Sequence, residues 1–262
     1  MALPTILVPL DLGREADRAL PVGRALADRT GGRLEVVVIT DTAEAAAAAS
    51  DQREVRAHAR RAGVGVDAIR LRTGGEDVVA ALADEAVGTG ATLCIATHAW
   101  GHLADLVAHG IAGRLVLRDG PMVLVGPHAR RDGEGPREVL ACVDGRSGSP
   151  AVPSVARTWA EWLGTKVRVL QVEEGHDCAG GARPAAVAAG AIHAEGVPAG
   201  WDVVAARSAE AGILAAAAEM DDPLIVVGSR SAPPEGLVPG TLHHVIRAVV
   251  AASADPVLVA PA

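Results

Sequence analysis

Short runs of apolar residues alternate along the chain with stretches in which apolar residues recur every three or four positions. The runs at residues 6–10 and 36–39 are rich in Val, Leu and Ile, as in strands that a parallel sheet buries on both faces. Between them, residues 15–28 carry a one-sided apolar pattern that stops at two glycines, which predicts a helix. This alternation of strand and helix favours parallel βαβ units with right-handed crossovers.

The strand pattern occurs twice in the chain. The run that ends at Asp11 resembles the run that ends at Asp144, 133 positions later. The strands expected at 34–40 and 167–173 keep the same offset. The sequence therefore predicts a tandem duplication.

Each repeat is expected to be one α/β domain, at residues 1–130 and 136–262, because domains of about 130 residues are common. Each domain is expected to hold a mainly parallel five-stranded sheet of Rossmann-like or flavodoxin-like type, with helices on both faces. The charged segment 130–137, with its Gly and Pro, is typical of a linker. Further helices are expected at 42–62, 76–87, 150–163 and 210–220, and strands at 64–70 and, weakly, 203–204. Residues 175–200 are rich in Gly, Ala and Pro, so a helix there is poorly specified.

The end of the chain carries a candidate ligand site. An apolar run at 224–227 is followed by Gly228, a loop with prolines and glycines, and Gly240-Thr241 before a helical pattern. This layout suits phosphate groups, because glycines let the backbone approach and a helix N-terminus supplies N–H donors. A strand, loop and helix without any ligand is the alternative. The aspartates after the first strand of each repeat are expected to meet these loops and to bind ribose or adenine, or else to cap the following turn.

Composition narrows the classes of function. The formal charge of −8 and the absence of Phe and Tyr argue against nucleic-acid binding. Lys166 is the only lysine and no P-loop motif surrounds it. Cys94 and Cys142 fall in predicted buried strands, which favours a structural over a redox role. There is no basic leader and no apolar run of eighteen residues, so we expect a cytoplasmic protein without a membrane partner.

The sequence resembles the tandem form of the universal stress protein family over nearly its whole length. The V-P-x-D pattern of the family's first strand stands at residues 8–11 and, in weaker form, at 142–144. Its P-V-L-V ending stands at 256–259, with a related run at 121–125. The resemblance implies two Rossmann-like (adenine nucleotide alpha hydrolase-like) domains that pair through their last strands as an internal pseudo-dimer. Dimerisation of the whole chain is left open.

Members of that family that bind ATP carry the motif G-x2-G-x9-G-[ST]. The second repeat keeps it in part, with Ser231 in place of one glycine and a loop one residue short before Gly240-Thr241. The first repeat has Ala96 and Ala99 in place of both early glycines, and Ile111 follows its last glycine. The resemblance therefore implies an ATP site, with Mg²⁺ as a possible companion, in the second repeat. Its candidate residues are Asp144, Val172, Val227, Gly228, Ser231, Gly240, Thr241 and Leu242, with Asp11 and Gly110 as weaker candidates in the first repeat.

We therefore expect an adenine-nucleotide-binding regulatory module in stress response, with possible protein partners. The alternative is a nucleotide-independent interaction protein in which both sites are degenerate. No catalytic residue is predicted, although weak ATP hydrolysis is left open. His98, His102, Asp105 and His109 are spaced as metal ligands could be, but a solvated loop is the favoured interpretation.

Overall fold

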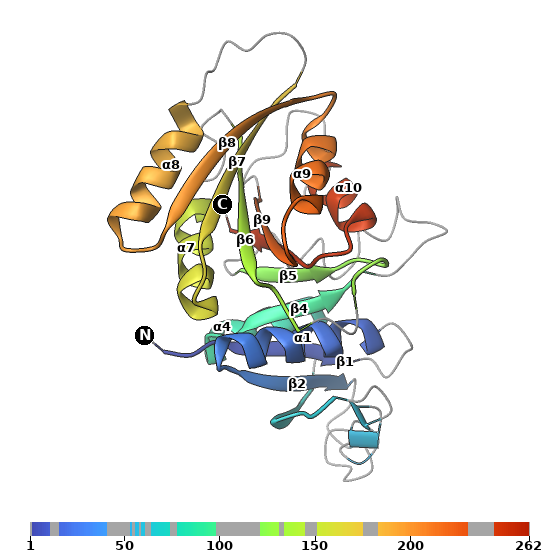
Figure 1. The fold of residues 1–262 in the computed structure, drawn as a ribbon. Coiled ribbons are helices and arrows are strands. Elements are labelled where there is room, and N and C mark those ends of the chain that lie inside the picture. Colours follow the sequence, from blue (N-terminus) through green and yellow to red (C-terminus); the bar gives the residue numbers. More distant parts are fainter. Residues whose placement is uncertain are drawn as a thin grey trace.

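The computed structural model describes residues 2–10, 16–40, 53, 56–57, 59–60, 64–73, 78–97, 121–130, 134–144, 151–174, 183–229 and 244–261 (Figure 1). We call the part before residue 131 the first half and the part after residue 133 the second half. The strands are β1 (Thr5–Leu10), β2 (Arg33–Thr40), β3 (Ala68–Thr73), β4 (Thr92–Ala96), β5 (Met122–Val125), β6 (Glu138–Val143), β7 (Val167–Glu174), β8 (Ala199–Ala206), β9 (Pro223–Gly228) and β10 (Val257–Ala260). The helices are α1 (Ala16–Thr30), α4 (Val78–Thr89), α7 (Ala151–Leu163), α8 (Arg183–Ala194), α9 (Ala209–Ala218) and α10 (His244–Ala252).

The strands form one ten-stranded sheet in the order β3-β2-β1-β4-β5-β10-β9-β6-β7-β8. Read from its outer edge inwards, each half has its own strands in the order 3-2-1-4-5, and strands within a half are parallel. This is the Rossmann order and not the flavodoxin order 2-1-3-4-5. The predicted α/β class, parallel strands and repeated connectivity are confirmed.

The two halves join where β5 and β10 pair antiparallel. Leu124 lies opposite Val257, and Met122 lies opposite Val259. These are the last strands of the two halves, where the family resemblance places the pairing, and their pairing joins the two five-stranded sheets into one. The physical reason is that β5 and β10 would each leave an unpaired strand edge, and pairing them satisfies both edges at once.

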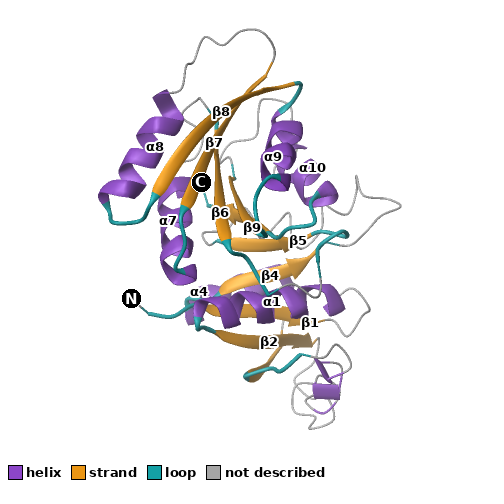
Figure 2. Ribbon diagram, in the orientation of Figure 1, coloured by secondary structure: helices purple, strands orange, loops and turns teal. Residues whose placement is uncertain are grey.

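Two hydrophobic layers cover the sheet, and each layer draws on both halves. One layer packs α1, α7 and α8 on the sheet, and the other packs α4, α9 and α10 (Figure 2). Side chains alternate between the layers along β10, where Leu258 faces the first and Val257 and Val259 face the second. The core is built from Val, Leu, Ile and Ala, as a chain without Phe and Tyr requires, and Trp159 is among its largest fully buried side chains.

The predicted linker packs against both halves. At its start, the backbone N–H of Arg130 donates a hydrogen bond to the carbonyl oxygen of Ala254, just after α10 (3.0 Å). Further along, the Arg29 guanidinium of α1 donates a hydrogen bond to the carbonyl oxygen of Pro136 (3.3 Å). The backbone N–H of Arg137 then donates to the carbonyl oxygen of Asp222 (2.9 Å).

Most predicted elements are present with shifted ends. The helix at 150–163 and the strand at 224–227 correspond to α7 and β9, and Gly31 ends α1 in the left-handed conformation (φ +67°). The third strand of the first half begins at Ala68 and not at residue 64. In the segment 175–200, where a helix was poorly specified, α8 is a full helix. The weak strand at 203–204 extends over all of β8.

Candidate functional site

The carboxyl ends of β6 and β9 lie side by side where the strand order of the second half reverses. β6 pairs with β7 on one side and with β9 on the other, and all three strands run parallel. Open parallel sheets bind ligands outside the carboxyl ends of their strands at such a reversal. Four of the predicted site residues, Asp144, Val172, Val227 and Gly228, lie in the described part of the chain at this edge.

Asp144 directly follows β6 and is partly exposed. Because Val143 pairs with Gln171, Asp144 and Val172 each lie one residue beyond that pair. β7 continues to Glu174, whereas β6 ends at Val143. The end of β7 therefore extends past Asp144 and flanks it.

Gly228 is the last residue of β9 and is partly exposed, while the preceding Val227 is buried. Gly228 pairs with Ala260 of β10, and the N–H of Ser229 donates to the Ala260 carbonyl oxygen (2.9 Å). Ser229 is buried, so Gly228 is the last partly exposed residue that the structure describes at this strand end. A backbone without a β-carbon is thus presented at the strand end next to Asp144.

The first half has Ala96 at the place of Gly228. Ala96 pairs with Val125 at the end of β5, and the N–H of Thr97 donates to the Val125 carbonyl oxygen (2.9 Å). This repeats the arrangement of Gly228, Ala260 and Ser229 in the second half. The registers therefore place a methyl group in the first half where the second half has none.

The other predicted site residues lie outside the described residues, and their roles stay predictions. They are Asp11, Gly110, Ser231, Gly240, Thr241 and Leu242, together with the histidines at 98, 102 and 109 and Asp105.

The N-terminus of α9 lies at the same edge, and sequence reasoning did not single it out. The Ser208 hydroxyl accepts a hydrogen bond from the N–H of Ala211 (3.4 Å), and Glu174 Oε1 of β7 accepts one from the N–H of Ala209 (2.6 Å). Hydrogen bonds from its own N–H and from the Ser208 side chain lower the pKa of Glu210. The sequence does carry a signal for this helix start. Ser208, a preferred N-cap residue, stands directly before an alanine-rich run and three residues before Ala211, from whose N–H it accepts the hydrogen bond.

Comparison with solved structures identifies the fold. A universal stress protein from Archaeoglobus fulgidus DSM 4304 superposes with a TM-score of 0.65 and 18% identity, over 98% of this chain and 96% of that chain. The chain has the fold of the universal stress proteins. A functionally unknown protein from Pseudomonas aeruginosa PAO1 superposes with a TM-score of 0.58 and 16% identity, over 99% of this chain and 93% of that chain. No family model and no curated protein matches the sequence.

The charged groups at this edge are of both signs. Asp144 offers a partly exposed carboxylate, which accepts hydrogen bonds from ribose hydroxyls. Glu173 and Glu174 add negative charge at the end of β7, which repels phosphate oxygens. The start of α10 at His244 carries the positive end of a helix dipole.

The cysteines that the structure describes are suited to packing. Cys94 is fully buried and forms no disulfide, and desolvation raises the pKa of its thiol to about 12. Desolvation likewise raises the pKa of the Cys142 thiol to about 12, although part of that residue is exposed. Thiols with such pKa values are poor nucleophiles at neutral pH.

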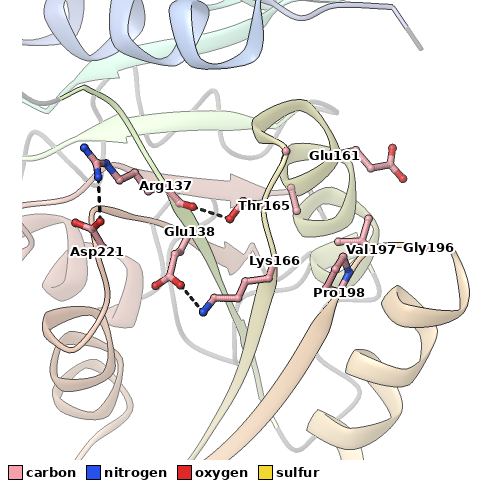
Figure 3. A pocket seen from close by; sticks show the side chains of 11 residues that line it. Arg137, Glu138, Glu161, Thr165, Lys166, Gly196, Val197, Pro198 and Asp221 are labelled. Carbon is pink, nitrogen blue, oxygen red and sulfur yellow. Dashed lines mark hydrogen bonds and ion pairs between the residues drawn. The ribbon is translucent and has the colours of Figure 1, made fainter.

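A groove lies at the opposite edge of the second half, by the amino ends of its strands. It is an open groove of about 810 Å³ in which Lys166 Nζ lies 2.7 Å from Glu138 Oε1 and Arg137 Nη1 lies 3.3 Å from Asp221 Oδ2 (Figure 3). The Thr165 hydroxyl donates to the Arg137 carbonyl oxygen (2.6 Å). These charged groups pair with one another across the groove. None of the predicted site residues lines it.

The part of the chain that the structure describes has neither a membrane-spanning helix nor a cluster of metal-ligating side chains. None of its helices is long and apolar enough to cross a membrane. Nowhere among those residues do three His, Cys, Asp or Glu side chains gather as a metal site would need.

Proposed function

We propose that this protein binds ATP in its second half and acts as a regulatory nucleotide-binding module in stress response. The observation that carries the proposal is the position of Gly228 at the strand-order reversal, beside Asp144, where the first half has Ala96. The shared fold with a universal stress protein over nearly the whole chain supports it.

Each described residue has a chemical role in the proposal. Asp144 accepts hydrogen bonds from the ribose, and Val172 and Val227 form the walls beside it at the ends of β7 and β9. Gly228 leaves room for close approach of the ligand to the backbone. Gly240 and Thr241, together with Ser231 and Leu242, would supply N–H groups and hydroxyls to the phosphates. When bound, Mg²⁺ would neutralise phosphate charge.

The proposal assigns binding without useful turnover. Hydrolysis of ATP needs a group that orients or deprotonates the attacking water, and the sequence around the glycine loop offers no acid except Glu235. We expect phosphate release with Mg²⁺ to stay far below the usual enzymatic median of about 10 per second. Turnover near that rate that is lost on Glu235→Gln would make the protein an enzyme instead.

A matched pair of variants tests the site. Gly228→Ala gives the second half the residue of the first, and we expect it to weaken ATP binding about tenfold, because a β-carbon costs about 1 kcal/mol or more where the backbone must approach a ligand. Ala96→Gly makes the reverse change in the first half and is expected to leave affinity and stoichiometry unchanged. Acid extraction of the purified protein, followed by chromatography, shows directly which nucleotide it carries. Loss of binding in Ala96→Gly, with Gly228→Ala unaffected, would contradict the proposal.

A further inference from the structure

Helix α9 packs directly on strand β7 at Gly212. A β-carbon built on Gly212 would stand 2.7 and 2.8 Å from the two γ-carbons of Val172 and 3.2 Å from the β-carbon of Ala206. β-Carbons essentially never come within 3.0 Å of a heavy atom outside their own residue and its two chain neighbours. The approach of α9 to β7 therefore depends on glycine at this position.

Rotation of Val172 does not remove the conflict. The two methyl groups of valine fill two of the three staggered positions about χ1. In the structure, the two methyl groups of Val172 occupy the two staggered positions that face Gly212. Any other rotamer moves only one methyl group to the third position, so a methyl group still faces Gly212. A side chain at 212 could be accommodated only if α9 or β7 moved.

Helix propensity does not explain a glycine at this position of α9. Its sequence, AEAGILAAAA, is otherwise made of good helix formers, and glycine destabilises a helix interior relative to alanine. Gly212 is also buried. Close packing on Val172 is the physical reason for a glycine here.

α9 contacts both sides of the proposed nucleotide site. On one side it rests on Val172 and receives the cap from Glu174 of β7. On the other side it packs along α10, whose first residue, His244, follows the loop of Gly240 and Thr241. The position of α9 therefore sets the separation between the end of β7 and the start of α10.

The first half has alanine at the corresponding position. The offset of 132 positions that relates Ala96 to Gly228 also relates Ala80 of α4 to Gly212 of α9. The same offset relates Gly90 (φ +61°) to Asp222 (φ +46°), which have the same backbone conformation in the turn after each helix. The first half thus carries a β-carbon where the second half carries none, as it does at Ala96.

We propose that Gly212 is a positioning residue of the nucleotide site. By letting α9 rest on Val172, it fixes the distance between the β7 side of the ligand, at Val172, and the phosphate side, at α10. The inference rests on the proposed function, because it concerns the same site.

A double-mutant cycle with ATP and Mg²⁺ tests this role by calorimetric titration. Gly212→Ala is expected to raise the Kd for ATP about tenfold, because overpacking displaces α9. In a Val172→Ala background, which removes both γ-carbons, Gly212→Ala is expected to change the Kd by less than about twofold. The matched control is Gly190→Ala in α8, where a β-carbon meets no atom within 4 Å, and it is expected to leave the Kd unchanged.

The outcomes separate the two proposals. Binding of ATP by the wild type with equal affinity in Gly212→Ala would overturn the positioning role and leave the proposed function standing. An equal loss of affinity from Gly212→Ala in both backgrounds would also overturn it, because the effect would not depend on Val172. Absence of ATP binding by the wild type would overturn both proposals. If Gly212→Ala alone failed to fold, the comparison within the Val172→Ala background would decide: an unchanged Kd supports the role and a raised Kd contradicts it.

Discussion

Glu35 on β2 and Arg168 on β7 occupy the same place in the two halves and carry opposite charges. Glu35 Oε2 lies 2.5 Å from Arg70 Nε on β3, and Arg168 Nε lies 2.6 Å from Asp202 Oδ2 on β8. In both halves the ion-pair partner lies on the neighbouring outer strand. Arg70 pairs in register with Val37, two positions after Glu35, and Asp202 pairs in register with Leu170, two positions after Arg168. The repeat thus conserves the position of an ion pair while its direction is reversed.

Reversing one member of the first pair is expected to destabilise the protein. The Glu35 side chain is 8% exposed, so Glu35→Arg would place two guanidinium groups together in a partly buried site. We expect the free energy of unfolding to fall by about 3 kcal/mol. Urea unfolding measures this change.

The double variant Glu35→Arg/Arg70→Glu is the control. It restores an opposite-charge pair, so we expect it to recover at least half of the lost stability, short of all of it because Glu85 also lies 3.3 Å from Arg70. A double variant that is no more stable than Glu35→Arg would contradict this account of the pair.

Much of this architecture was accessible from the sequence, and the exceptions have physical causes. The run of β9 and the periodicity of α7 are strong local signals. α8 was poorly specified because its many Ala and Gly residues weaken the helical pattern of apolar positions. Contacts outside the helix support it: α8 packs against α7, and the Ala185 N–H donates a hydrogen bond to Gln171 Oε1 (3.3 Å).

The site was accessible to a similar degree. The repeat could be predicted from the strand patterns. The alanine at position 96 could be recognised as a change from the glycine motif, because glycine is needed where a backbone must approach a ligand. Gly212 could not be assigned a role in this way, since its partner Val172 lies forty positions earlier and meets it only in the folded chain. The pairing of β5 with β10 could be expected from the family resemblance alone, because two strands of four residues carry no local information about their partner.

Asp222 adopts a backbone conformation that favours glycine, with φ at +46°. It also forms an ion pair with Arg130 of the linker. Both Asp222→Gly and Asp222→Ala remove the ion pair, but only alanine keeps a β-carbon at positive φ. We therefore expect Asp222→Ala to be less stable than Asp222→Gly by about 1 kcal/mol, measured by urea unfolding. Equal stabilities would show that the conformation costs nothing at this turn.

Asp255 is expected to make stability depend on pH. Desolvation raises its pKa above the ordinary value of 3.8, although attraction to Arg130 opposes this shift. A folded-state pKa above the unfolded value means that the folded state binds the proton more tightly. The resulting stabilisation is complete below pH 3.8 and is lost as the pH rises through the folded-state pKa.

The variant Asp255→Asn removes this titration. We therefore expect the stability of Asp255→Asn relative to wild type, measured by urea unfolding between pH 3.5 and pH 7, to improve as the pH rises. A relative stability that worsens with rising pH would mean that the attraction to Arg130 outweighs desolvation.

The central claim, that ATP binds in the second half, is tested most directly by calorimetric titration of ATP into Gly240→Val and Gly110→Val. Gly240 is followed by Thr241, which keeps a hydroxyl for phosphate, whereas Gly110 is followed by Ile111. The account predicts that wild type and Gly110→Val bind ATP with the same affinity and that Gly240→Val loses binding. Loss of binding in Gly110→Val, with binding retained in Gly240→Val, would place the ligand in the first half and contradict it.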